Sequence, residues 1–134
     1  MIQENKELLL KDLCARLPYG VKVQFSYVIT SPAILKGINK DLNLVECDIA
    51  VCELEDVKPY LFPLSSMTEE QKKEYENALT YHDYVKGGWT IAKLFDDEYV
   101  IPYWFVDFCN KNHIDYRSLI EKELAINATN LNIY

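Results

Sequence analysis

The sequence predicts an α+β fold, and two patterns carry most of that prediction. Apolar residues recur at helical spacing over residues 3–17, and apolar and polar residues alternate over most of residues 21–30. A chain of 134 residues has the usual length of one domain. We therefore expect residues 1–134 to form a single domain, with a helix and a small sheet in residues 1–64 and a helical, aromatic-rich half in residues 65–134.

The N-terminal helix is predicted by an apolar stripe. The stripe consists of Leu9, Leu10, Leu13, Cys14 and Leu17. Glu4 and Glu7 favour the positive end of the helix dipole. The segment Pro18–Gly20 should end the helix, because proline and glycine both interrupt helical backbone.

Four stretches of the first half predict strands. They are residues 21–30, 34–38, 45–51 and 57–64. The last is expected at an edge or to be short, because Pro59 and Pro63 cannot donate hydrogen bonds to a ladder. Short strands closed by turns favour a small antiparallel sheet, either simply curled or closed into an SH3-like barrel, and such modules usually bind other molecules.

The second half is predicted to hold a surface helix, a hairpin and C-terminal helices. Ser66 with Glu69, or alternatively Thr68 with Gln71, forms a capping box at the start of the surface helix. The other expected elements are a continuation of that helix to about residue 84, a hairpin of residues 89–95 and 99–101, a buried helix beginning at Pro102, and a short helix capped by Asp115 and reaching Glu121.

The charge of the chain argues against direct binding to nucleic acid. The formal net charge is −7 and the isoelectric point is about 4.8, whereas nucleic-acid-binding proteins cluster lysine and arginine. The longest basic run is Lys72-Lys73, and acidic residues flank it. We expect the acidity either to keep the protein soluble or to attract a basic protein partner.

The chain shows no export or membrane signal. Residues 1–7 lack the basic and apolar regions of a signal peptide, and no apolar run is long enough to span a membrane. We therefore expect a cytoplasmic protein. Its four cysteines (Cys14, Cys47, Cys52 and Cys109) are then expected to be reduced and buried.

Residues that could carry chemistry are few and poorly spaced. Cys47 and Cys52 form the one close cysteine pair, but a straight strand would place them on opposite faces, so neither a metal site nor a bridge is expected. Cys109 and His113 would share a helix face as a nucleophile and base, although Asn110–Asn112 should end the helix between them.

Acidic clusters likewise lack the spacing of a dedicated cation loop. The two densest are residues 53–56 and 96–98. The sequence thus predicts no catalytic residue, no metal and no cofactor, and we expect the protein not to be an enzyme.

Aromatic residues are concentrated in the second half of the chain. Part of this density belongs to a core, and the rest can form an exposed surface for a partner protein. The candidates for this surface are Tyr81, Tyr84 and Trp89.

Three segments of the chain have familiar wording: Lys6–Lys22 (containing LCARLPYGVK), Asp56–Gln71 (DVKPYLFPLSSMTEEQ) and Asn110–Lys122 (NKNHIDYRSLIEK). Together they resemble a family of small uncharacterised proteins from gut Bacteroidetes that are often carried on prophages and other mobile elements. The resemblance implies a bacterial or phage cytoplasmic origin and no particular activity. The family's last motif usually reads Asp-Tyr-Arg-Gly-Leu-Ile. Ser118 stands at the glycine position, which argues against a special backbone conformation there.

Two functions from the binding class follow as hypotheses. The first is a non-catalytic accessory protein of a phage or mobile element that acts through contacts with an unidentified protein. The second is an acidic inhibitor of a nucleic-acid-binding host protein, such as a defence effector. An enzyme of unrecognised type remains the third alternative.

Overall fold

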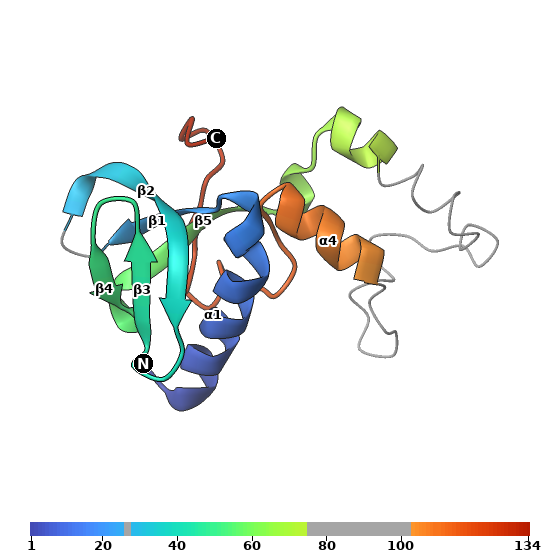
Figure 1. Cartoon of the computed structure of the whole chain (residues 1–134). Coiled ribbons are helices and arrows are strands. Elements are labelled where there is room, and N and C mark those ends of the chain that lie inside the picture. Colours follow the sequence, from blue (N-terminus) through green and yellow to red (C-terminus); the bar gives the residue numbers. More distant parts are fainter. Residues whose placement is uncertain (26–27, 75–102) are drawn as a thin grey trace.

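The computed structural model describes residues 1–25, 28–74 and 103–134 (Figure 1). It confirms the α+β class, with an N-terminal helix, a mixed seven-stranded sheet and further helices. The described strands form an open sheet, not the barrel that was one of its two expected forms. The predicted hairpin at residues 89–101 lies outside the described residues.

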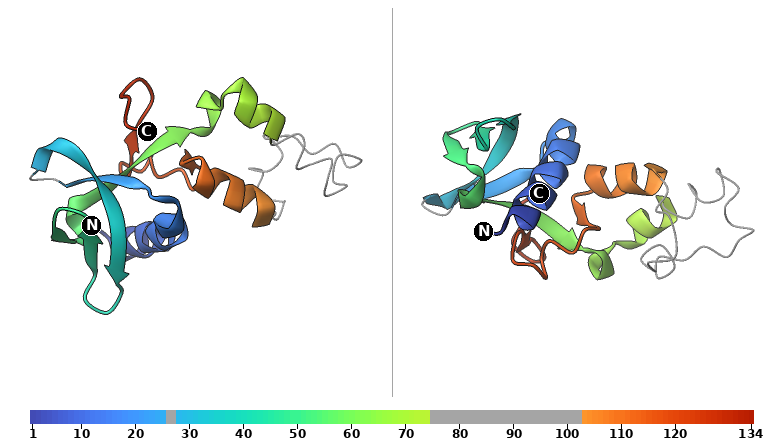
Figure 2. Two further views of the ribbon diagram at one scale, coloured as in Figure 1. Left: turned by 45° about the horizontal axis from the view of Figure 1, so that its top comes forward. Right: turned by 90° about the horizontal axis from the view of Figure 1, so that it is seen from below.

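Helix α1 (Gln3–Arg16) begins and ends close to its predicted limits, and the 3₁₀ turn η1 (Leu17–Tyr19) follows it. Gly20 then adopts a left-handed conformation with φ of 65°, which glycine reaches without steric cost. Leu9 and Leu13 of the predicted stripe are buried against the sheet. Figure 2 shows α1 lying beside the strands in both views.

The sheet has the strand order β4-β3-β2-β1-β5-β6, and β7 also pairs with β5. Its first four strands are β1 (Lys22–Phe25), β2 (Val28–Asn39), β3 (Leu44–Cys47) and β4 (Val51–Glu53). The single strand predicted over residues 21–30 is wrong, because Phe25 at the end of β1 pairs with Val28 at the start of β2. The alternating pattern continues across this reversal and therefore reads as one strand.

The single strand predicted over residues 45–51 is also wrong. The chain reverses between β3 and β4, where the Cys47 N–H donates to the Ala50 carbonyl at 2.8 Å. Cys52 pairs with Val45 of β3, so Cys47 and Cys52 are both buried in one core. The reversal places these two thiols on the same side, contrary to the opposite faces expected from a straight strand.

Strand β5 (Val57–Pro63) is internal, although its prolines predicted an edge. It pairs antiparallel with β1, and parallel with the two-residue strands β6 (Ile114–Asp115) and β7 (Ile126–Asn127). Because β6 and β7 are so short, few main-chain N–H groups of β5 need to donate hydrogen bonds to them. Phe62, whose N–H donates to the His113 carbonyl at 2.8 Å, supplies one of them.

The 3₁₀ turns η2 (Leu54–Asp56) and η3 (Leu64–Ser66) flank β5. The Thr68–Gln71 capping box is confirmed, since the Thr68 N–H donates to Gln71 Oε1 at 2.9 Å and the Gln71 N–H donates to Thr68 Oγ1 at 3.1 Å. Residues 69–74 are helical. Helix α4 (Tyr103–Lys111) is the buried helix predicted after Pro102.

The short helix predicted after Asp115 is not formed. Asp115 does cap, because its carboxylate accepts from the N–H groups of Arg117, Leu119 and Ile120 at 3.2, 3.0 and 2.9 Å. The capped segment is a series of turns, however. Ser118 has a backbone φ of 59°, which lies in the left-handed region that favours glycine. The expectation that a serine here argues against a special backbone conformation is therefore wrong.

Two hydrophobic clusters form the core of the described residues. The larger joins α1 to the sheet and includes Leu9, Leu13, Val23, Phe25, Leu35, Val45, Leu54 and Leu61. The smaller lies around α4 and consists of Met67, Phe105, Phe108, Cys109, Ile114 and Tyr116. Polar contacts made by α1 connect the two clusters.

Candidate functional site

The Cys109–His113 pair does not have the features of an activated nucleophile. Cys109 is fully buried in α4, and burial raises the pKa of its thiol to about 12. His113 follows the end of the helix with φ of 58° and stacks on Tyr134, with ring centroids 3.9 Å apart. Burial, reinforced by nearby Arg16 and Lys22, lowers the pKa of His113 to about 4. At neutral pH the thiol is therefore protonated and the imidazole is neutral.

Cys47 and Cys52 are also core residues, whereas Cys14, expected to be buried, is only half-buried. Burial and the neighbouring Cys52 raise the pKa of Cys47 to about 12. All four cysteines are free thiols. Within residues 1–25, 28–74 and 103–134, histidines, cysteines and carboxylates do not form a group of three that could hold a metal ion.

The strongest charge cluster is buried and was not foreseen from the sequence. Asp12 and Arg16 of α1 are both fully buried, and Arg16 Nε donates to Asp12 Oδ2 at 2.8 Å. The second Asp12 oxygen accepts from Arg117 Nε at 3.2 Å. Arg16 also donates to the carbonyls of Cys109 and Ile114 at 3.4 and 2.7 Å.

These contacts give the cluster a structural role. Each Asp12 oxygen has a guanidinium partner, and the remaining Arg16 nitrogens donate to the main-chain carbonyls of Cys109 in α4 and Ile114 in β6. Arg117 further donates to the Tyr116 hydroxyl at 2.8 Å and lies over the Tyr116 ring. The charged groups of this cluster therefore bind one another and main-chain carbonyls. The sequence signal was a spacing of four between Asp12 and Arg16, which also occurs in exposed helical ion pairs.

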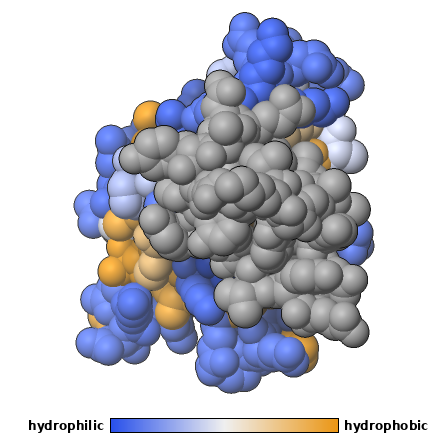
Figure 3. Space-filling model, turned by 90° about the vertical axis from the view of Figure 1, so that its right-hand side faces the viewer, coloured by the Kyte–Doolittle hydropathy of each residue, from blue (hydrophilic) through white to orange (hydrophobic). Residues whose placement is uncertain are grey.

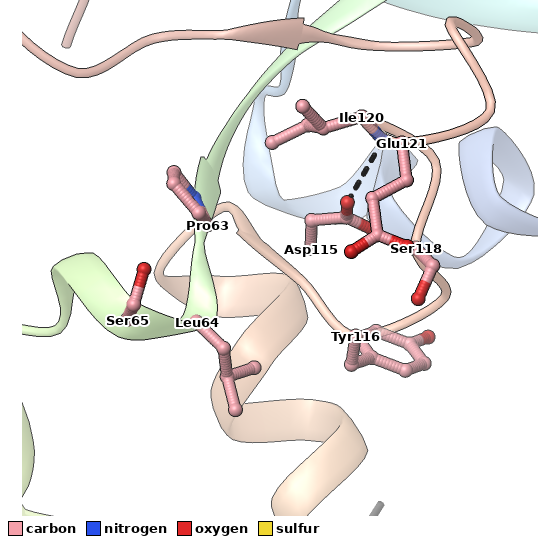
Figure 4. A pocket seen from close by; sticks show the side chains of 8 residues that line it. All are labelled: Pro63, Leu64, Ser65, Asp115, Tyr116, Ser118, Ile120 and Glu121. Atoms are coloured by element: carbon pink, nitrogen blue, oxygen red, sulfur yellow. Dashed lines mark hydrogen bonds between the residues drawn. The ribbon is translucent and has the colours of Figure 1, made fainter.

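A pocket of about 370 Å³ lies beside this cluster, between η3 and the turns that follow β6. In Figure 4, Pro63, Leu64 and Ser65 form one side, and Asp115, Ser118 and Glu121 lie on the other. The Asp115 carboxylate is already committed to main-chain N–H groups. Glu121, the other acidic residue that lines the pocket, is exposed and can contact a ligand.

Exposed apolar residues lie at the other end of the sheet, on the β3–β4 hairpin and in the β2–β3 turn that leads into it. Leu42, Ile49 and Val51 have exposed fractions of 65%, 56% and 59%. A shallow groove of about 350 Å³ crosses the outer face of this end of the sheet. It is lined by Gly37, Ile38, Asn39, Leu44, Glu46 and Val51. We call this region the β4 surface: the outer face and free edge of residues 41–56.

The β4 surface is strongly acidic. Residues 41–56 contain six aspartates and glutamates and no lysine or arginine, against a net charge of −7 for the whole chain. Glu46 and Glu53 are exposed on the same outer face as Val51. Lys6 of α1 pairs with Glu55 and lowers the pKa of that carboxyl. Exposed acidic side chains thus lie beside the exposed Val51 on this face.

In Figure 1 the β4 surface lies at the left, and α4 lies at the right. Figure 3 shows the α4 side, where hydrophilic residues occupy most of the described margin and a smaller hydrophobic area lies beside them. Tyr81, Tyr84 and Trp89, the predicted interaction residues, lie outside the described residues. Sequence reasoning missed the β4 surface because Ile49 and Val51 were assigned to a half-buried strand.

No protein-family model, no curated protein and no solved structure matches this chain. No helix within the described ranges is long and apolar enough to cross a membrane. The geometry of the described residues is therefore the basis for a functional proposal.

Proposed function

We propose that this protein is a non-catalytic accessory protein that binds another protein through the β4 surface, and that it serves a phage or mobile element in a bacterial cytoplasm. The observation that supports the binding role is the exposure of Ile49 and Val51 on the β3–β4 hairpin, together with that of Leu42 in the turn that leads into β3. Apolar side chains that gather on a surface mark sites of protein contact more often than isolated ones do.

The titratable groups described above also favour binding over catalysis. The thiols with shifted pKa values lie in the core. The buried carboxylates Asp12 and Asp115 are occupied by structural hydrogen bonds. Shifted or buried titratable groups at an active site would instead converge on a cleft with room for substrate.

A second candidate function follows from the charge of residues 41–56. Six acidic residues without a basic one fit a basic partner surface, such as the groove of a nucleic-acid-binding protein. Under this alternative the protein inhibits its partner by occupying that groove. Competition with nucleic acid for the captured partner separates the two candidates.

Affinity capture from the organism that carries the gene tests the binding role. Tagged protein is purified with and without nuclease, and partners are identified by mass spectrometry. We expect a stoichiometric partner that survives nuclease and is lost when Leu42 and Ile49 are both changed to serine.

The matched control changes Ile2 and Leu131 to serine, because these residues are exposed to 62% and 49% but lie elsewhere. It should retain the partner. Equal capture by both double variants, or turnover of a substrate that a Cys109 or His113 variant abolishes, would contradict the proposal.

A further inference from the structure

Strand β4 is the last strand at its end of the described sheet, with β3 as its neighbour. The Cys47 N–H donates to Ala50 and the Leu54 N–H donates to Asn43, at 2.8 and 2.9 Å. Main-chain groups of an antiparallel strand face its neighbour at every second residue. Ala50, Cys52 and Leu54 therefore face β3, whereas the N–H and C=O groups of Val51 and Glu53 point outward.

An outward row of main-chain donors and acceptors is a template for another strand. Natural sheets usually protect such an edge with lysine, proline or a covering element. The β4 sequence Val51-Cys52-Glu53 contains no lysine and no proline, and Val51 is largely exposed. Among the described strands none pairs with this edge, so its outward main-chain groups can pair with another strand.

We propose that the β4 edge binds an extended, basic segment of a partner protein, which adds to the sheet as one more strand. This inference rests on the proposed protein-binding function and specifies its mode and partner. Val51 and Glu53 share the outer face of the sheet, because they are two residues apart. The added strand places an apolar side chain beside Val51 and a lysine or arginine beside Glu53.

Charge favours a basic segment over other occupants. Glu53 of β4 and Glu46 of β3 lie on the same outer face, so this face carries negative charge that a basic segment offsets. A second copy of this chain is a poorer occupant. Each copy carries a net charge of −7, and pairing two β4 edges would bring the Glu53 carboxylates of both copies to one seam.

The probe is a blocked octapeptide, Lys-Thr-Val-Thr-Lys-Thr-Val-Thr, whose lysines and valines alternate on one face of an extended strand. Its control replaces both lysines with glutamate. Binding to the full chain is followed by fluorescence anisotropy. We expect the basic peptide to bind at least about tenfold more tightly than the acidic one, because unlike charges across strands attract and like charges repel.

Val51→Pro tests the main-chain contact without changing charge. Proline removes the outward N–H and leaves the bonds to β3, so we expect about tenfold weaker binding, while Val51→Thr should bind as the original chain does. Circular dichroism establishes that Val51→Pro is folded. If it is not, Glu53→Lys replaces it, with Glu70→Lys as the control of equal charge change; Glu70 is exposed on the helical residues 69–74.

The outcomes distinguish this inference from the proposed function. Loss with Val51→Pro or Glu53→Lys, and not with the controls, supports strand addition. Strand addition is overturned if Val51→Pro and Glu53→Lys bind the peptide as the original chain does. It is also overturned if the free chain forms a dimer that Val51→Pro dissociates. A cellular partner that is lost with the Leu42 and Ile49 variants but retained by Val51→Pro would overturn strand addition while leaving the protein-binding function intact.

Discussion

Arg16 Nη2 donates to the Ile114 carbonyl at 2.7 Å, a contact between residues 98 positions apart. Arg16 belongs to α1 and to the sheet-bearing half, whereas Ile114 belongs to the small cluster around α4. The guanidinium is fully buried and neutralised by Asp12. The buried Asp12–Arg16 ion pair on α1 therefore connects the two hydrophobic clusters.

Asp12→Ala should lower the free energy of unfolding by about 3–5 kcal/mol, because it leaves the buried Arg16 charge without its carboxylate. Urea unfolding followed by circular dichroism measures this. The double variant Asp12→Leu with Arg16→Met should be more stable than Asp12→Ala, since no buried charge then remains unpaired. A cost below about 1 kcal/mol for Asp12→Ala would show that the pair is solvated.

Ser118→Gly should raise the free energy of unfolding by about 0.5–1 kcal/mol. The φ of 59° at this residue strains any side chain but not glycine, and the gain is partly offset by the greater freedom of glycine in the unfolded chain. Ser65→Gly is the control, because Ser65 lies across the same pocket without a positive φ. Stabilisation by both changes would refute the conformational explanation.

His113 should make the protein less stable as the pH falls from about 6.5 to about 4. Its folded pKa of about 4 lies below the ordinary value of 6.5, so the unfolded chain binds the proton more readily in this range. Above pH 6.5 the penalty is absent, and below pH 4 it is complete. We expect His113→Asn, which tolerates positive φ, to show a smaller loss of stability across this range in urea titrations at several pH values.

If the original chain and His113→Asn lose stability in parallel between pH 6.5 and pH 4, the acid sensitivity comes from other groups. Measuring both proteins in the same buffers cancels the contribution of the carboxylates.

Cys14 should react with iodoacetamide in the native protein well before the other three cysteines. Cys14 is half-buried, whereas Cys47, Cys52 and Cys109 are buried, and the raised pKa values of Cys47 and Cys109 keep those thiols protonated. Mass spectrometry of peptides labelled before and after addition of denaturant measures the order. Native labelling of Cys109 at the rate of Cys14 would revive the nucleophile hypothesis.

The elements that the sequence predicts best are those with strong local signals. The apolar stripe of α1 and the Thr68–Gln71 box both correspond to observed contacts. Chain reversals between β1 and β2 and between β3 and β4 were missed, because alternation persists through a tight turn. The internal position of β5 depends on β6 and β7, which lie far along the chain and have only two residues each.

The candidate site was harder to predict because it depends on topology. Whether Val51 lies at an edge is decided by which strands pair, and its own sequence reads as part of a buried strand. Likewise, Asp12 and Arg16 look like a surface ion pair until the burial of that face of α1 is known. The acidity of residues 41–56, by contrast, can be read directly from the sequence, because this segment contains no basic residue.

The central claim is that the β4 surface contacts a partner protein. The most direct measurement is photo-crosslinking in the native cell, with benzoylphenylalanine placed at Val51 and, as a control, at the exposed Glu70. We predict one crosslinked protein that depends on position 51 and whose attachment point lies in an extended segment rich in lysine or arginine. Equal crosslinking from both positions, or none from position 51, would contradict the account.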